Sequence, residues 1–410
     1  MIYRGTILNP QSSTKCDFYV DGGLVVEKGK ILDVGDFAKI AEKFGKQKIT
    51  DTKSIIIPAF TDIHLHWVQN RVKGSFGGTL LPWLKNYIWP EEAKFAKEKY
   101  TDKMARKFSK ELQQNGTKNG IIYSSIHKYS TEKAIEDGKK NGNFIIGNVL
   151  MDQNSPDYLQ VATKKEIELV EYFAKKYKNK YAITPRFAPT CTMELMQKTA
   201  KIAKKYGCFI QTHLSENKDE IAWVKALFPD QKSYTEVYLK AGLLGKNTIV
   251  GHCIHLSNDE LKILAKTGTK IAHCPTSNVA LKSGRMPVEK IVKYKIPFAL
   301  ATDIGAGPKL SMLDVMKSYL KIHKKFYKAT PIEALYRATL AGAEIMGINS
   351  KHGNLNKGKQ AEFVMMKKSE LKMSDDKNKI IGSFVSSNVK IKIPKIGIKL
   401  LNTAERIFRL

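Results

Sequence analysis

The sequence predicts an α/β protein, namely a (β/α)8 TIM-type barrel with a small composite β domain formed by the N- and C-terminal segments. Three observations predict this fold. Between about residues 55 and 345, short apolar segments alternate with amphipathic ones, as repeated βα units require. There are eight such apolar segments, and eight βα units of this length favour a closed barrel over an open sheet. The two ends of the chain show strand and turn patterns instead.

The β domain is expected at both ends of the chain. Residues 24–35 contain two apolar runs on either side of a Lys-Gly pair, which indicates a β-hairpin. Residues 353–366 show the same pattern of short strands and turns, and residues 389–400 alternate between apolar and polar side chains. The predicted division is therefore 1–54 for the N-terminal part of the β domain, 55–345 for a metal-dependent barrel and 346–410 for the C-terminal part.

The barrel is predicted from strands and helices in regular alternation. The expected strands are 54–66, 120–127, 143–152, 181–189, 208–216, 247–253, 269–275 and 297–303. Among the helices, 194–207 has apolar residues at helical spacing on one face and lysines on the other, and Gly207 is placed to end it. The segment 258–268 has the same form, with Asn258 or Asp259 as the expected N-cap.

Length and composition are those of a large globular protein. With 410 residues, of which 42% are hydrophobic, the chain can form a barrel with an accessory domain. No apolar stretch reaches the 18 or so residues of a membrane span, and the start lacks signal-peptide features, so we expect a cytoplasmic protein without membrane contact. The five cysteines have no Cys-x-x-Cys spacing, which argues against a disulfide framework and a thiolate zinc site.

The net charge is strongly positive. The chain has 69 Lys+Arg against 39 Asp+Glu, a formal charge of +30. Such a field attracts nucleic acid non-specifically. However, the lysines are spread along the chain, and no basic motif interleaved with aromatic residues accompanies them. We therefore interpret the charge as a solvated lysine coat and expect no specific nucleic-acid binding.

Polar residues at the ends of the predicted strands indicate the function, because the chemistry of a (β/α)8 barrel takes place at the C-terminal ends of its strands. In chain order these residues are His64, His66, Arg186, His213, Glu216, His252, His273 and Asp303. They include five of the nine histidines of the chain. Scattered surface histidines would not follow the strand ends in this way.

A metal site is the interpretation that this set favours. His64 and His66 are one residue apart, so both imidazoles face the same side of the strand, about 6–7 Å apart along the backbone, where one ion could bind both. Three imidazoles and a carboxylate from separate strand ends are what a single zinc ion with an open position requires.

Thiolate ligands are not expected in this site. If His252 and His273 point into the barrel, their neighbours Cys253 and Cys274 point outward beneath the helices. The His-x-Glu and Pro-Cys-x-x-Cys signature of cytidine-deaminase zinc sites is also missing from the sequence.

Specific local motifs identify a family resemblance over about residues 1–365. They are "HLHWVQ", "WLKNYIWPEEAKF", "ITPRFAPTC", "THLSENKDE", "GHCIHLS", "AHCPTSN" and "LATDIGAG". With these motifs the chain resembles the amidohydrolase superfamily, in its mononuclear deaminase branch. "TPRF" and the Gln of "HWVQ" are similar to members that act on guanine, so the resemblance implies hydrolytic deamination of guanine to xanthine and ammonia.

The resemblance also implies roles for individual residues. It implies one zinc ion per subunit, bound by His64, His66, His213 and Asp303. It implies that Gln69, Arg186 and Phe187 bind the purine. His252 would orient or polarise the attacking water, and Asp303 can accept its proton. Glu216 would protonate the ring nitrogen and then deliver a proton to the leaving amine.

Several expectations stay open at this point. The substrate could be another purine such as 8-oxoguanine or an adenosine derivative, and the chain could instead be a non-catalytic basic binding protein on the same fold. The resemblance implies a homodimer. Residues 83–90 and 275–284 could be lids over the pocket or ordinary βα loops. After about residue 365 the likeness fades.

Overall fold

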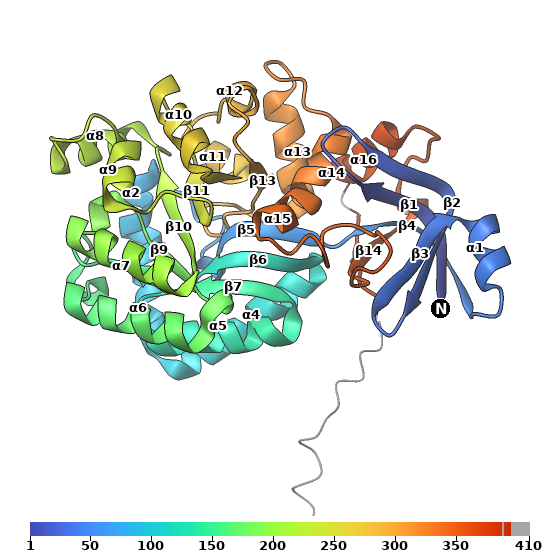
Figure 1. The fold of residues 1–410 in the computed structure, drawn as a ribbon, viewed down its shortest axis with the longest axis horizontal. Coiled ribbons are helices and arrows are strands. Elements are labelled where there is room, and N and C mark those ends of the chain that lie inside the picture. Colours follow the sequence, from blue (N-terminus) through green and yellow to red (C-terminus); the bar gives the residue numbers. More distant parts are fainter. Residues whose placement is uncertain (388, 395–410) are drawn as a thin grey trace, which may run out of the picture.

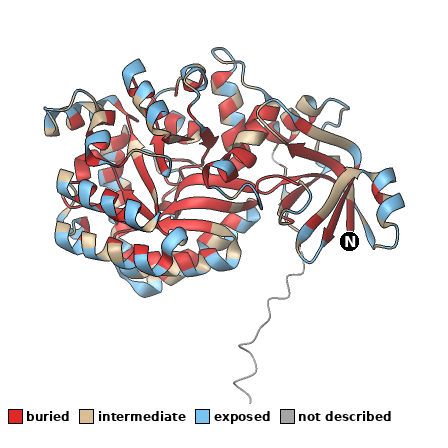
Figure 2. Cartoon of the chain, in the orientation of Figure 1, coloured by how far each residue is buried: buried red, intermediate tan, exposed pale blue. Residues whose placement is uncertain are grey.

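The computed structural model describes residues 1–387 and 389–394. It has two parts, a barrel surrounded by helices and a smaller β domain beside it (Figure 1). The strands in the middle of the barrel are buried, whereas the outer faces of its helices are exposed (Figure 2). The predicted fold class is confirmed.

Parallel strands form the barrel in chain order. They are β5 (Phe60–His66), β6 (Thr117–Tyr123), β7 (Asn143–Gly147), β8 (Val149–Leu150), β9 (Ala182–Pro185), β10 (Phe209–Leu214), β11 (Thr248–His252), β12 (Lys270–His273) and β13 (Phe298–Leu300). A bridge between Ile146 and Tyr181 joins the group β5–β7 to the group β8–β13. At the other seam, the Asp303 amide donates to the His64 carbonyl at 2.9 Å. Two of the expected site residues therefore meet where the ring closes.

Helices cover the outside of the barrel, as Figure 1 shows. The longer ones are α4 (Glu98–Gln114), α5 (Lys128–Asn141), α6 (Thr163–Tyr177), α7 (Met193–Tyr206), α8 (Lys218–Leu227), α9 (Tyr234–Ala241), α10 (Asn258–Thr267), α13 (Met312–His323) and α14 (Pro331–Ala338). The shorter ones are α2 (Leu80–Trp83), α3 (Trp89–Glu92), α11 (Pro275–Ala280), α12 (Val288–Lys293) and α15 (Leu340–Ile345). Gly207 ends α7 in a left-handed conformation, as predicted. The N-cap of α10 is Ser257, not Asn258 or Asp259, because Ser257 and Glu260 form a capping box.

The two ends of the chain form one sheet in the smaller domain. Its strands are β1 (Ile2–Pro10), β2 (Cys16–Glu27), β3 (Lys30–Asp36), β4 (Ile49–Pro58), β14 (Phe363–Lys367) and β15 (Ile391–Lys392), and α1 (Phe37–Phe44) packs on it. The spatial order is β15-β14-β4-β1-β2-β3. The expected composite β domain is confirmed, and so is the hairpin within residues 24–35, where Glu27 pairs with Lys30.

The first expected barrel strand is in fact two strands. Residues 54–58 belong to β4, where Pro58 pairs with Phe363 of β14, and the barrel begins only at Phe60. The apolar run looks continuous in the sequence because its first part is buried in the β domain and its second part is buried in the barrel. The division of the chain into 1–54, 55–345 and 346–410 stays a prediction, and residues 395–410 lie outside the described residues.

A helix near the C-terminus was not expected. Helix α16 (Lys377–Ser386) packs against α13 and α14. Its residues Ile380, Ile381, Phe384 and Val385 are buried at helical spacing, and the side chain of Asp376 caps its start. The segment after residue 365 is therefore attached to the barrel helices as well as to the sheet.

The described residues contain no helix suited to cross a membrane. None of their helices combines the length and the apolar character that a membrane span requires.

A buried glutamate of the barrel makes stability depend on pH. Glu166 on α6 is fully buried, and burial raises its pKa to about 8. Between its ordinary pKa of 4.5 and about 8 the folded chain keeps the proton and the unfolded chain loses it. Stability is therefore lost as pH rises through this window, by up to about 1.4 kcal/mol per pH unit.

Glu166→Gln is accordingly expected to become more stable relative to wild type as pH rises from 5 to 8. Gln resembles the neutral acid but cannot ionise, so the difference in Tm should grow across this range in thermal melts. Glu171→Gln, which changes a half-exposed carboxylate of the same helix, serves as the control. A Tm difference that is constant with pH would contradict the assignment.

Candidate active site

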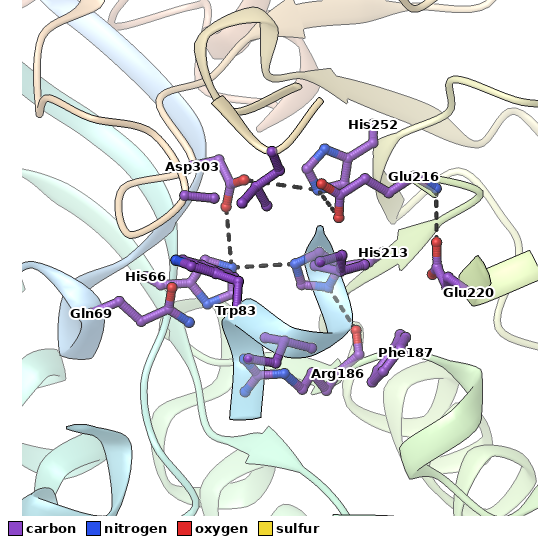
Figure 3. Close-up of a pocket in the computed structure, with 14 residues that line it drawn as sticks. His66, Gln69, Trp83, Arg186, Phe187, His213, Glu216, Glu220, His252 and Asp303 are labelled. Carbon is purple, nitrogen blue, oxygen red and sulfur yellow. Dashed lines mark hydrogen bonds and ion pairs between the residues drawn. The ribbon is translucent and has the colours of Figure 1, made fainter. Parts of the chain in front are cut away.

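One pocket lies at the C-terminal ends of the barrel strands and contains most of the predicted site residues. It encloses about 400 Å³, including its mouth. His66, Gln69, Arg186, His213, His252 and Asp303 line it together with apolar side chains (Figure 3). The fold thus brings residues up to 237 positions apart in the chain, from His66 to Asp303, into the same pocket.

Four of these strand-end residues are close enough to share one ion. Ligand atoms of His64, His66, His213 and Asp303 all lie within 4.8 Å of one another. Asp303 Oδ1 is 3.4 Å from Nε2 of both His64 and His66, and His66 Nε2 is 3.3 Å from His213 Nε2. The predicted set is therefore brought together by the fold.

The protonation of these histidines suits metal binding. Burial lowers the pKa of all three imidazoles, so they are neutral. His213 Nδ1 donates to the Arg186 carbonyl at 2.6 Å, which leaves the lone pair on Nε2 facing the other ligands. Burial also raises the pKa of Asp303, but His64 and the other histidines lower it by more, so the net shift is downward and Asp303 is ionised.

An unpaired ring nitrogen within the cluster suits a bound cation. Neither ring nitrogen of His64 has a hydrogen-bond partner among the described residues, and neither does Nδ1 of His66. A buried polar atom without a partner costs about 1–3 kcal/mol. Three neutral imidazoles and one carboxylate are a normal ligand set for zinc, and an ion bound among them would give His64 Nε2 a partner, although it would not reach Nδ1 of either ring.

His252 and Glu216 lie beside this cluster. His252 Nδ1 donates to Asn278 Oδ1 at 2.9 Å, so Nε2 is the atom that faces the pocket, 3.5 Å from Glu216 Oε2. Burial lowers the pKa of His252, but Glu216 and Asp303 raise it by more, and the net shift is upward. A histidine of this kind can donate or hold a proton near the reacting atoms.

Glu216 is held as a buried acid. Burial raises its pKa, and the charge of Asp303 raises it further. The Ser283 hydroxyl donates to Glu216 Oε1 at 3.0 Å. Its backbone is fixed by Glu220, whose Oε2 accepts from the amides of Glu216 and Asn217 at 2.9 and 3.1 Å. Glu220 was not predicted as part of the site, although its spacing from Asn217 is that of a capping box.

Gln69, Arg186 and Phe187 form the opposite side of the pocket. Gln69 lies in a turn after β5, and the other two follow β9. Phe187 is buried and contacts Trp223 edge to face. Both polar side chains donate to one carboxylate, Glu92, which lies on α3 and was not predicted as a site residue because it does not follow a strand.

One expected orientation is wrong. His273 points away from the pocket, toward α13, where its Nε2 lies 2.9 Å from His323 Nε2. Cys274 points inward instead and comes within 4.8 Å of ligand atoms of His252 and Asp303. Strand alternation explains this, because Ala272 packs in the barrel interior, so His273 faces out and Cys274 faces in.

His252 faces the pocket because of its backbone conformation and not because of strand alternation. Its neighbour Gly251 faces inward, so close to His64 that an added Cβ would lie 2.9 Å from that ring. Because successive side chains of a strand point to opposite faces, His252 would be expected on the outer face of the barrel. Its backbone is left-handed, with φ of 69°, and so is that of Asp303, with φ of 47°. Such strained backbone is typical of functional positions, and here it redirects the two side chains.

The two segments considered as lids both form walls of the pocket. Residues 275–284 supply Ser277, whose hydroxyl donates to Asp303 Oδ2 at 2.6 Å, as well as Asn278 and Ser283. The segment 83–90 supplies Trp83 and Leu84 to the lining, and Leu80 just before it also lines the pocket. Residues 275–284 are held to the site by these three hydrogen bonds.

The chain is similar to known proteins over most of its length. The amidohydrolase family matches residues 55–393. The guanine deaminase of Escherichia coli K12 is 37% identical over 376 residues, covering 88% of this chain and 84% of the relative. The human guanine deaminase is 30% identical over 390 residues, covering 89% and 86%. The crystal structure of guanine deaminase from C. acetobutylicum with bound guanine is similar at a TM-score of 0.83 and 36% identity, covering 89% and 90% of the two chains.

Proposed function

The chain belongs to the amidohydrolase family, and we propose that the pocket at the end of its barrel is the active site. The protein is an enzyme that deaminates guanine by hydrolysis, giving xanthine and ammonia. The observation that carries this conclusion is the similarity to guanine deaminases over most of the chain. The complete set of converging polar residues in one pocket supports it.

The enzyme uses a metal cofactor, which we propose to be one zinc ion per subunit. His64, His66, His213 and Asp303 would hold it, since their ligand atoms converge and His64 Nε2 has no hydrogen-bond partner among the described residues. A divalent ion at this position supplies Lewis-acid chemistry that activates water at neutral pH. The described residues bring no thiolate into this set of four.

Purine binding is proposed for the side of the pocket that holds Gln69, Arg186 and Phe187. Arg186 has only hydrogen-bond donors, which suits the O6 and N7 acceptors of guanine. Phe187 gives the ring an apolar contact surface. Adenine carries a donor at position 6 and would leave the Arg186 donors facing another donor, a mismatch that discriminates strongly.

Proton transfer is proposed for Glu216 and His252. Burial keeps Glu216 protonated to a higher pH than a free glutamate, so it can protonate the ring nitrogen and later the leaving amine. His252 is oriented by Asn278 and presents Nε2 toward Glu216, where it can position the attacking water. Asp303 is ionised and can accept the proton that this water loses.

Metal removal tests the proposed function. The purified protein should release ammonia and form xanthine from guanine, and dialysis against a chelator should lower kcat/KM by about 100-fold or more, because the Lewis acid is lost. Added Zn²⁺ should restore the rate. 8-Oxoguanine and adenosine, assayed in parallel, report the selectivity. Absence of xanthine, or a rate that chelation does not change, would contradict the proposal.

A homodimer, a cytoplasmic location and the absence of specific nucleic-acid binding stay predictions.

A further inference from the structure

We propose that Glu92 is a positioning residue that determines specificity, because it holds Gln69 and Arg186 in one clamp and sets which of their atoms face the purine. This inference rests on the proposed function and concerns the same pocket. Glu92 is the last residue of α3 and does not line the pocket itself.

Both carboxylate oxygens of Glu92 are engaged. Gln69 Nε2 donates to Oε1 at 2.8 Å, and Arg186 Nη1 donates to Oε2 at 2.8 Å. The side chains of Glu92 and Arg186 are 1% and 4% exposed, so this ion pair is shielded from water. A charge-assisted contact of this kind is stronger and more directional than a neutral one. The clamp therefore holds two residues that come from different strands.

The carboxylate decides the orientation of the Gln69 amide. An ionised carboxylate only accepts hydrogen bonds, so Gln69 must turn its NH2 group toward Glu92. Figure 3 shows the amide nitrogen on the side of Arg186 and the oxygen on the side of Asp303. That oxygen packs on Gly305, where an added Cβ would lie 2.0 Å from it. The oxygen of Gln69 is thus left as an acceptor at the pocket.

The clamp also compensates the positive charge of Arg186 beside the histidines proposed as metal ligands. Arg186 and the proposed ligand His66 line the same pocket, so the guanidinium charge lies on the pocket that holds the ligand cluster. Glu92 neutralises this charge, and no other acceptor among the described residues binds the Arg186 side chain, so its other N–H groups can face the substrate. The pocket therefore presents a fixed acceptor from Gln69 and fixed donors from Arg186.

This fixed polarity matches one class of purine edge. Guanine and hypoxanthine carry a donor at N1 beside an acceptor at O6, whereas adenine carries the reverse pattern. Without the carboxylate, an amide at position 92 could donate as well as accept, and Gln69 could turn over. The variant should then discriminate less well between the two edge patterns. In the wild type, a purine with the wrong pattern leaves a donor or acceptor of the site unpaired, and this mismatch is the source of discrimination.

Glu92→Gln tests this with Glu91→Gln as the matched control. Glu91 is the neighbouring buried glutamate, and it binds Arg71, Lys94 and Tyr100 outside the pocket. Kinetic measurements should give KM for guanine and the inhibition constants of hypoxanthine and adenine. For Glu92→Gln we expect KM to rise about 10-fold and the adenine/hypoxanthine ratio of inhibition constants to fall about fivefold or more. Glu91→Gln should leave both within about twofold of wild type.

The outcomes separate the two proposals. If wild type forms no xanthine, the proposed function fails, while purine dissociation constants measured by calorimetry still test the clamp. If Glu92→Gln does not fold by circular dichroism, Glu92→Asp replaces it, since it keeps the charge but is too short to hold both partners. The same fall in ratio is expected. A folded variant with normal metal content and an unchanged adenine/hypoxanthine ratio would overturn the inference.

Discussion

Replacing Asp303 with asparagine is expected to lower kcat/KM for guanine by about 1000-fold or more, since a metal-activated step loses several kcal/mol of stabilisation with its ligand. Asp303 contributes the one negative charge among the four converging groups and lies 3.4 Å from two of the histidines. Asparagine keeps the size but neither binds the ion as well nor accepts a proton. The measurements are xanthine formation and elemental analysis of the protein as isolated.

Asp259→Asn is the control for this change. Asp259 lies on the surface at the start of α10 and, within the described part of the chain, pairs only with Lys262. It should keep wild-type activity and metal content. Normal activity together with normal metal content in Asp303→Asn would remove Asp303 from the site and with it the proposed ligand set.

Glu216→Gln is expected to lower kcat by about 10²- to 10⁴-fold, because glutamine cannot carry a proton to the ring nitrogen or to the leaving amine. The metal content should stay at the wild-type level, since Glu216 is outside the four proposed ligands. KM should change little, because the contacts assigned to the purine lie on the other side of the pocket. Rapid-quench measurement of a single turnover would show the loss in the chemical step itself.

Two further variants make the result on Glu216 specific. Ser283→Ala removes the single hydroxyl that donates to Glu216 and should have a much smaller effect on kcat. Glu194→Gln, on the exposed face of α7, should have none. A kcat for Glu216→Gln close to that of Glu194→Gln would exclude Glu216 as the proton carrier.

The convergence of the four proposed metal ligands was largely predictable from the chain. Parallel barrel strands end at the same rim, so histidines and carboxylates that follow apolar runs are brought together whatever their separation in sequence. His64, His66, His213 and Asp303 follow this rule. The rule failed for His273, which faces outward. Whether a residue faces inward or outward depends on which of two alternating positions it occupies in the strand, and an apolar run of a few residues does not reveal this.

The contacts that orient the site were not predictable in this way. Glu92 lies 94 residues from Arg186 and on a helix, so no local pattern links the two. Helix α16 was missed because the alternating residues beyond it suggested strands throughout the C-terminal part.

The sequence by itself determined the class of fold, the composite terminal domain and the residues at the strand ends, because hydrophobic periodicity and strand order are local properties of the chain. Only the tertiary structure decided which side chains enter the pocket, how Glu92 joins Gln69 to Arg186, and how Asn278 and Glu220 hold His252 and Glu216. These depend on strand phase, on left-handed backbone at His252 and Asp303, and on contacts between distant segments. Such features arise only when the barrel closes.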